Sequence, residues 1–573
     1  MRLLGTGVGF ALIALMGCAP PSVDNTGTGG SDATGGRGGS GSGGSGSGGS
    51  MTTGSGGRSS SGGATGSGGS ASSGGAPGTG GGGTGGATGS GGATGTGGTT
   101  ASGGTTGTGG AGGRGGATGS GGSAGKGGTT GTGGASGSGG TTSAGGSAGG
   151  SAGGSAGGTT GSGGSSTSCT ITATSSFSTA IPTVAIVTWS TTLTSLTKAE
   201  IDFGPAAGGT AMVAPVDLTQ ASYRTLLLGM KPSSSYAYKI VAANASGSCT
   251  SSSYTIMTGA LAGTVPKVTP TISNASAHDK GFIVTSTGLN GNTTFIIDPD
   301  GTVVWSATGP SMPSRSHLSW DGTHMYMMAL NVMNTNAGNI ESVAMDGTGN
   351  TSLAGVTTSH HDLTPIPGGF ATMLWNKSGT DAPCSLVERA EATGQFTTVV
   401  ADMGSVYNST TFHSNSVHYY ATDDTYTVGD RNPSLYVKLT RAGQLVWQFG
   451  GSNPKDQSKF FTGVPTWSVN HGHQLLSDGT FIFFNNGANE AWGYTLDTTK
   501  MTATKILGYT ASGATSNVLG DVQRLPNGNY LVTFSVGGQI HELSPSGTLV
   551  AKFASSSFGY SEFRESLYGQ PPY

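Results

Sequence analysis

The chain has 573 residues, of which 112 are glycine, and its 24 basic residues are nearly balanced by 27 acidic residues. This length predicts more than one domain. The balanced charge and the lack of any Lys/Arg-rich run argue against a nucleic-acid-binding protein. Most of the glycine lies before residue 167, so the two parts of the chain need separate interpretations.

The N-terminal sequence MRLLGTGVGFALIALMGCAP places one arginine before a short apolar run that ends at Cys18. The run is too short to span a membrane and is typical of a signal peptide. Its end, LMGC, resembles a bacterial lipobox, in which cleavage before the cysteine leaves that residue to carry lipid. Residues 1–18 are therefore predicted to be a lipoprotein signal peptide with Cys18 lipidated, and the alternative is an ordinary secretion signal. With Ala19 after the cysteine, the resemblance implies an exported lipoprotein of the outer membrane, on its periplasmic face or at the cell surface.

Residues 19–166 are predicted to be a disordered linker. From residue 25 they consist almost wholly of Gly, Ser, Thr and Ala, as in GGSAGGSAGGSAGG. Such a segment cannot bury enough apolar surface to offset the entropy lost on ordering, so it should behave as a flexible coil. The phrase SAGKGG at 123–128 lacks the first glycine and the Ser/Thr of a phosphate-binding loop, and is therefore assigned to the linker as well.

Residues 167–262 alternate polar and apolar residues over short runs such as VAIVTWSTT and SYAYKIVAANASG. This pattern predicts a small antiparallel β-sandwich. Cys169 and Cys249 bracket the segment, and an oxidising compartment favours a disulfide between them, which leaves Cys384 as a free thiol. The core Trp189 and the phrase LGMKPSSSYAYKIVAANASG resemble a fibronectin type III domain.

A turn-plus-strand phrase recurs through residues 265–573, as in DPDGTVVW, TRAGQLVW and SPSGTLVAKF. Aligned positions fall at 300, 346, 393, 442, 497 and 546, and no helical periodicity lies between them. Six units of four short strands predict a six-bladed β-propeller. A solenoid could share this period, but ring closure is typical of such four-stranded units. The predicted fold is therefore all-β, with a β-sandwich and then a β-propeller after the long linker.

Histidines gather at corresponding positions of these units. His361 and His471 each lie eight residues before the closing glycine of a repeated phrase, and His413 begins the matching strand of the fourth unit. Because the inner strands of a propeller run along its central channel, equivalent positions should form a ring around the channel mouth. Strand alternation further predicts that His413 and Asn415 share one face, and that His471 and His473 share one face.

The phrases HHDLTPIPGG, HSNSV followed by GDR, NHGHQLLSDG and FRESLYG are similar to those of the bacterial arylsulfate sulfotransferase family. The resemblance covers roughly residues 265–573. It implies a PAPS-independent enzyme that moves a sulfuryl group from a phenolic sulfate ester to a phenol through a sulfohistidine, without a cofactor. In this interpretation His471 is the nucleophile. The further site residues are His361, His413, Asn415 and Arg431, which bind the sulfuryl group, with His360 and His473 as additional substrate-binding residues. NHGH stands where the family has a QHD-like sequence, so His473 stays open as the acceptor.

The same chemistry follows from the residue types. Neutral imidazole is a competent nucleophile, and a covalent intermediate divides the displacement of a phenolate into two steps. Arg431 and Asn415 would bind the equatorial oxygens of the sulfuryl group. His413 or His361 could protonate the departing phenolate and then deprotonate the acceptor phenol.

Two other functions fit the sequence. HGH on a strand would put two imidazoles on one face, and His361 or His413 could complete the three-histidine zinc site of a metal-dependent hydrolase. No Asp/Glu cluster accompanies these residues and Arg431 would repel a cation, so no metal is expected. The third possibility is a non-catalytic binding propeller at the cell surface, with the linker as its stalk.

Overall fold

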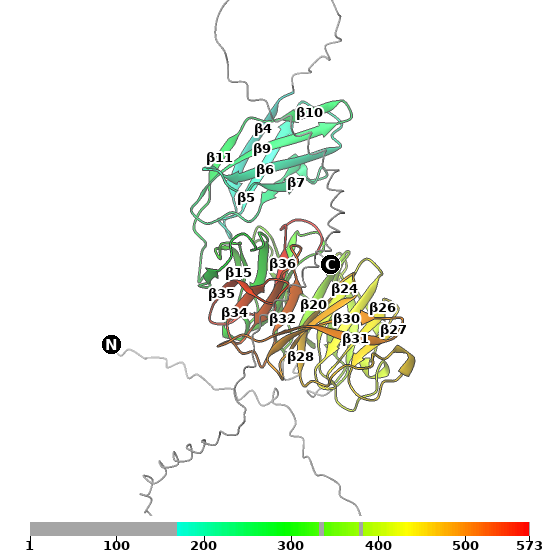
Figure 1. Cartoon of the computed structure of the whole chain (residues 1–573). Coiled ribbons are helices and arrows are strands. Elements are labelled where there is room, and N and C mark those ends of the chain that lie inside the picture. The colour runs from blue at the N-terminus through cyan, green and yellow to red at the C-terminus, as the bar shows by residue number, and fades with distance from the viewer. Residues whose placement is uncertain (1–168, 332–336, 378–381, 572–573) are drawn as a thin grey trace, which may run out of the picture. The chain divides into compact units, whose positions relative to one another are not determined.

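The computed structural model of the protein describes residues 169–331, 337–377 and 382–571 (Figure 1). Within these ranges the regular structure consists of β-strands and four short 3₁₀ turns, at Ala221–Tyr223, Gly288–Asn290, Met403–Ser405 and Gln457–Lys459, which confirms the predicted all-β fold. The predicted signal peptide, the lipidated Cys18 and the linker lie outside the described residues. In the part of the chain that is described, no helix has the length and apolar character needed to cross a membrane.

Two antiparallel sheets form the first folded region. One contains β10 (Gly247–Thr250), β9 (Ser235–Asn244), β6 (Lys198–Pro205) and β7 (Met212–Pro215), with β11 (Tyr254–Met257) also paired to β9. The other contains β4 (Ile171–Phe177), β5 (Ala185–Thr191) and β8 (Thr225–Leu227). Alternate residues of β9 are buried, as expected for strands with one face on a core. The resemblance of this region to a fibronectin type III domain stays a prediction.

The cysteines are paired as the sequence predicted. Cys169, just before β4, forms a disulfide with Cys249 on β10. Cys384 is a buried free thiol. The disulfide closes a segment with a sequence separation of 80 residues, so it ties the start of this region to its penultimate strand.

Six antiparallel sheets follow, and in each of them four strands lie side by side from the channel outward. The first contains β36 (Glu562–Arg564), β13 (Phe282–Ser286), β14 (Thr293–Ile297) and β15 (Val303–Thr308). The second contains β16 (Pro313–Leu318), β17 (His324–Ala329), β18 (Ile340–Ala344) and β19 (Thr351–Ser352). The third contains β20 (Ser359–Ile366), β21 (Gly369–Trp375), β22 (Cys384–Ala390) and β23 (Phe396–Val400).

The other three sheets repeat this order. The fourth contains β24 (Ser414–Tyr420), β25 (Thr425–Asp430), β26 (Leu435–Thr440) and β27 (Leu445–Gly450). The fifth contains β28 (Asn470–Leu475), β29 (Thr480–Asn485), β30 (Glu490–Asp497) and β31 (Thr502–Tyr509). The sixth contains β32 (Asp521–Arg524), β33 (Tyr530–Phe534), β34 (Gln539–Leu543) and β35 (Leu549–Ala554), with β12 (Thr269–Ile272) added at its outer edge.

The inner strands β16, β20, β24, β28 and β32 contact one another in that order, and the C-terminal β36 completes the ring. Figure 1 shows β36, in red, beside the green strands of the first sheet, to which it pairs through β13. On its other side, the side-chain oxygen of Gln523 on β32 accepts a hydrogen bond from the backbone N–H of Phe563 at 2.9 Å. Radial repetition of this kind leaves only short, protected strand edges. The six-bladed β-propeller predicted from the repeats is thereby confirmed.

A buried ion-pair cluster lies among the inner strands. The guanidinium of Arg315 on β16 donates to Asp362 on β20 at 2.6 Å and to Asp521 on β32 at 2.8 Å. The same guanidinium lies 4.2 Å from the ring centroid of Tyr560. All of these groups are buried, so each charge depends on its partners for stabilisation. The cluster therefore connects the second, third and sixth blades.

Candidate active site

Three neighbouring inner strands depart from a regular ladder close to their first residues. Register shifts occur in β20 between Ser359 and Leu363, in β24 between Ser414 and Ser416, and in β28 between Asn470 and His473. A bulge leaves residues unpaired and changes the direction of their side chains. The residues inside these three bulges include His361, Asn415 and His471.

The backbone of His361 is itself unusual. Its φ of 62° lies in the left-handed region, which costs about 1–3 kcal/mol for a residue other than glycine. Val469, just before β28, has a φ of 60°, and this region is still less favourable for a β-branched residue. Strained residues thus precede or occupy two of the three bulges, as is common at functional sites.

The structure brings the predicted histidines together. The ring centroid of His361 lies 4.9 Å from that of His413 and 5.9 Å from that of His471. His360 lies 5.1 Å from His361 and stacks on Trp375 at 3.9 Å. These histidines are almost completely buried. They form one cluster at the N-terminal ends of β20, β24 and β28.

His413 reaches this cluster from a position that differs from the predicted one. An equivalent backbone hydrogen bond joins the start of the first strand to the end of the second strand in three blades. The three bonds run from Trp375 N–H to Thr358 O, from Arg431 N–H to His413 O, and from Asn486 N–H to Val469 O, and each is 3.0 Å long. His413 is therefore the counterpart of Thr358 and Val469, in the loop before β24. Counted from this position, Asn415 corresponds to His471 and to His360, so the predicted common register of His361, His413 and His471 is wrong.

His473 does not belong to the cluster. Its ring nitrogens lie 2.9 Å from the hydroxyl of Ser416 and 2.7 Å from that of Thr427, and its ring packs 4.8 Å from Tyr436. The prediction that His471 and His473 share a face is wrong, because the bulge in β28 interrupts the alternation between them. The substrate-binding role assigned to His473 is corrected to a packing role between β24 and β28.

The end of the second strand also contributes a residue near the histidines in each of three blades. Trp375 is the last residue of β21, whereas Arg431 and Asn486 directly follow β25 and β29. Trp375 packs against His360 and lies 5.4 Å from the His413 ring. Burial lowers the pKa of both His361 and His471, and the positive charge of Arg431 adds to the lowering in each. Asn486 places its side-chain oxygen 2.7 Å from Nδ1 of His471. Sequence reasoning assigned Arg431 to the site but missed Asn486.

Burial keeps the central imidazoles neutral. It lowers the pKa of His471 to about 3, an effect that the charge of Arg431 reinforces and the hydrogen bond to Asn486 opposes. Burial and the neighbouring His413 hold the pKa of His361 well below its ordinary value. At neutral pH both rings therefore have an unprotonated nitrogen, which is the form required of a nucleophile or a metal ligand.

The thiol of Cys384 and the carboxyl group of Asp430 contact the histidine cluster from outside. His360 places Nδ1 2.9 Å from Nδ1 of His361 and Nε2 3.0 Å from the sulfur of Cys384. Burial raises the pKa of the Cys384 thiol well above its ordinary value, so the thiol keeps its proton. Asp430 accepts hydrogen bonds from Tyr407 and from the backbone N–H of His413, while burial raises its pKa to about 6.

The predicted three-histidine metal site is not the one that the fold assembles. That site used His471 and His473 together, and His473 points elsewhere. His360, His361 and His413 do place one ring nitrogen each within 4.8 Å of one another, a spacing from which a cation could be bound after small movements. The positive charge of Arg431 also acts on His361, and it favours an anion over a cation.

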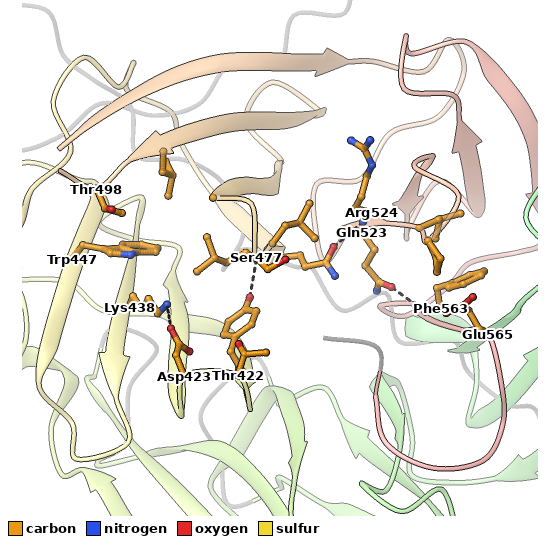
Figure 2. A pocket seen from close by; sticks show the side chains of 18 residues that line it. Thr422, Asp423, Lys438, Trp447, Ser477, Thr498, Gln523, Arg524, Phe563 and Glu565 are labelled. Carbon is orange, nitrogen blue, oxygen red and sulfur yellow. Dashed lines mark hydrogen bonds and ion pairs between the residues drawn. The ribbon is translucent and has the colours of Figure 1, made fainter. Parts of the chain in front are cut away.

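A separate pocket of about 730 Å³ lies at the opposite ends of the inner strands (Figure 2). Its lining includes Tyr420, Leu475 and Arg524, from the C-terminal ends of β24, β28 and β32, and none of the predicted site residues. Figure 2 shows Lys438 and Asp423 in contact, with their charged atoms 2.6 Å apart. The propeller thus has a histidine end and a pocket end, and the predicted chemistry lies at the histidine end.

Comparison with known proteins agrees with the resemblance noted from the motifs. Residues 386–556 match the arylsulfotransferase (ASST) family. The matched segment contains His413, Asn415, Arg431 and His471, whereas His361 lies before it. The match supports a sulfotransferase activity in general terms. No curated protein matches the chain.

Among solved structures, the chain is similar to a putative 6-phosphogluconolactonase from Bacteroides fragilis NCTC 9343, with 16% identity, 50% of this chain and 98% of that chain covered, and a TM-score of 0.34. It is also similar to TolB from Acinetobacter baumannii, with 10% identity, coverage of 58% and 81%, and a TM-score of 0.33. Apo AztD from Citrobacter koseri gives 12% identity, coverage of 50% and 99%, and a TM-score of 0.27. Similarities at this level carry no argument about function.

Proposed function

Because residues 386–556 match the arylsulfotransferase family, we propose that this protein is an aryl-sulfate sulfotransferase. It transfers a sulfuryl group from a phenolic sulfate ester to a phenol, without PAPS or another cofactor, through a sulfohistidine at His471. The observation that carries the proposal is a buried, neutral His471 that lies in one cluster with the rings of His361 and His413 and feels the positive charge of Arg431.

In the first half-reaction a ring nitrogen of His471 attacks the sulfur of the aryl sulfate. The N–S bond forms as the bond between sulfur and the phenolic oxygen breaks, and the phenolate leaves with the electron pair of that bond. We assign protonation of the phenolate to His413, because the low pKa of His361 leaves that ring neutral and suited to donating a hydrogen bond.

The second half-reaction reverses these events. His413 takes the proton of the acceptor phenol, the phenolic oxygen attacks sulfur, and the N–S bond breaks to restore His471. One residue serves as acid and then as base because the two half-reactions mirror each other. Donor and acceptor should therefore give the parallel double-reciprocal lines of a ping-pong mechanism.

Arg431 and Asn415 are proposed to bind the sulfuryl oxygens. A guanidinium is the donor best suited to such an anion, and its positive charge beside neutral histidines matches the charge of a sulfate ester. The side-chain nitrogen of Asn415 donates to the backbone oxygen of Asn470 at 2.6 Å. One of its two amide hydrogens is committed in that bond, and the second can be donated to the substrate.

An assay with p-nitrophenyl sulfate tests the proposal. Release of nitrophenol that depends on added phenol is the expected result, together with a mass increase of about 80 Da on the enzyme after incubation with donor alone. Peptide mapping should place the added mass on His471. Release with water alone would mean a sulfatase, and an inactive protein without the adduct would favour the binding propeller.

A metal-dependent hydrolase is the second candidate function, and only the spacing of His360, His361 and His413 favours it. Metal analysis of the purified protein distinguishes the two functions. A stoichiometric transition metal whose removal abolishes turnover would replace the sulfotransferase proposal.

We further propose that the protein is exported and anchored to the outer membrane by lipid on Cys18. The LMGC phrase supports the anchor, and the disulfide between Cys169 and Cys249 suits an oxidising compartment. Cell fractionation of Cys18→Ala checks it. The variant should move from the membrane fraction to the soluble exported fraction, and an unchanged distribution would contradict the anchor.

A further inference from the structure

Asn486 directly follows β29 and occupies the blade position that Arg431 and Trp375 occupy in the two preceding blades. Its side chain is buried between two segments of the chain. On one side lies His471, and on the other lies the loop before β32, which contains Ser516 and Leu519. The hydrogen bonds of this one amide therefore connect the proposed nucleophile to the sixth blade.

The orientation of the amide is determined by its partners. Nδ2 lies 2.7 Å from the backbone oxygen of Ser516 and 2.6 Å from that of Leu519. Backbone oxygens only accept, so both amide hydrogens of Asn486 are donated to them. The reversed orientation would place the amide oxygen against two other oxygens. The oxygen of Asn486 must therefore be the atom that faces His471.

This orientation decides which nitrogen of His471 carries the proton. The oxygen of Asn486 lies 2.7 Å from Nδ1 of His471 and can only accept, so Nδ1 must donate. A neutral imidazole has a single N–H. Nε2 is then left with its lone pair, and the hydrogen-bond arrangement selects one of the two tautomers of the ring.

We propose that Asn486 is a positioning residue that holds His471 in the Nδ1-protonated tautomer, which makes Nε2 the sulfur acceptor. The proposal rests on the proposed function in so far as His471 is the nucleophile. The charge of the group that accepts the Nδ1 proton of His471 matters as well. After Nε2 bonds to sulfur, a neutral amide leaves the proton on Nδ1, so the sulfo-imidazole ring stays cationic and is a good leaving group in the second half-reaction.

Asn486→Asp would place a carboxylate oxygen against the backbone oxygens of Ser516 and Leu519 and lose both bonds to the loop, so the alanine variant is the test. Asn486→Ala removes the acceptor and frees the ring to protonate Nε2, which should slow adduct formation by about 10- to 100-fold.

Asn489 provides a matched control. Its side chain binds the same loop, donating to the backbone oxygen of Ala514 at 2.8 Å and accepting from the N–H of Ser516 at 2.6 Å, and none of these bonds involves His471. Asn489→Ala should loosen the loop as Asn486→Ala does, but leave the tautomer and the rate of adduct formation unchanged.

The test combines ¹⁵N NMR of histidine-labelled protein with single-turnover measurement of the adduct. The His471 resonance, assigned with His471→Asn, should show protonated Nδ1 and unprotonated Nε2 in the wild type and in Asn489→Ala. In Asn486→Ala it should show either a mixture of the two tautomers or a ring protonated on Nε2. A wild-type ring protonated on Nε2, or an unchanged tautomer in Asn486→Ala, would overturn the inference. A wild type without adduct but with the expected tautomer would instead contradict the proposed function alone.

Discussion

The two ends of the propeller channel differ in how their polar groups are used. At the pocket end the ladders of β24 and β28 are regular, Lys438 forms an ion pair with Asp423, and Arg524 donates a hydrogen bond to the hydroxyl of Tyr530 at 2.7 Å. At the histidine end the same two strands are bulged, and imidazoles stand beside a guanidinium.

This difference indicates where to look for chemistry in a propeller. The pocket end holds a cavity of about 730 Å³, which is large enough for a small ligand. However, its Lys438 and Asp423 already form an ion pair. The histidine end combines left-handed backbone, lowered histidine pKa values and a nearby cation. Strain and perturbed ionisation are better markers of a reactive site than cavity size.

The largest expected effect comes from replacing the proposed nucleophile. His471→Ala should abolish both the sulfuryl adduct and turnover, because no other group would accept the sulfuryl. His473→Ala, two residues along the same strand, should keep the adduct while losing about 1–3 kcal/mol of unfolding free energy, because its two hydroxyl partners are left buried. Intact mass spectrometry and urea unfolding measure the two outcomes. An adduct that survives in His471→Ala would exchange the assigned roles of the two residues.

Arginines at the two ends give the next comparison. Arg431→Ala should slow adduct formation by losing about 2–4 kcal/mol of charge stabilisation, while the nucleophile stays in place. Arg524→Ala at the pocket end should leave single-turnover rates as in the wild type. Rapid-quench measurement with p-nitrophenyl sulfate compares the variants. Equal losses of rate in Arg431→Ala and Arg524→Ala would contradict the assignment of the reaction to the histidine end.

Two buried histidines should respond to pH with opposite signs. The pKa of His471 falls to about 3 through burial and the charge of Arg431, against about 6.5 in an unfolded chain. Between these values the unfolded chain binds a proton that the folded protein does not. Unfolding free energy should therefore fall as pH drops from 6.5 toward 3, by about 1.4 kcal/mol per pH unit from this residue.

His278, near the pocket end, provides the contrast. Burial lowers its pKa, but the hydrogen bonds to Glu542 and to the backbone of Pro299 and the charge of Glu542 together outweigh that effect, and the net pKa is raised. Its contribution to stability is present below the unfolded pKa and is lost as pH rises through the folded pKa. Urea unfolding of His471→Asn and His278→Asn at several pH values should remove slopes of opposite sign. Slopes of one sign in both variants would contradict the assigned ionisation states.

The sequence predicted the architecture well because a propeller repeats a local pattern. The recurring turn phrases marked the blades, and the Cys169–Cys249 pairing followed from their placement around one domain. The rule that side chains alternate along a strand gave wrong positions in the bulged strands of the site. The bulges in β24 and β28 depend on pairing across strands, and no single-strand pattern shows an extra residue, so His413 and His473 were misplaced.

Asn486 was missed for a related reason. Its partners Ser516 and Leu519 lie 30 and 33 residues away in the sequence, so the bond exists only when two blades pack. A signal was nevertheless present, since Asn486 directly follows β29 as Arg431 directly follows β25 in the preceding blade. Alignment of GDR with FNN at the ends of β25 and β29 would have placed the two side chains at equivalent positions.

The smallest expected effect is at the pocket end. Lys438→Met removes an ion pair whose aspartate side chain is 47% exposed, and pairs of this kind contribute about 0–1 kcal/mol. Unfolding free energy should change by no more than that amount. Turnover with aryl sulfate and phenol should stay at the wild-type value, because the ion pair lies at the far end of β24 from His413 and Arg431. A large loss of turnover in Lys438→Met, with folding intact by circular dichroism, would move the substrate site to the pocket and reverse the comparison. Unchanged turnover here, beside its loss in His471→Ala, would place the reaction at the histidine end.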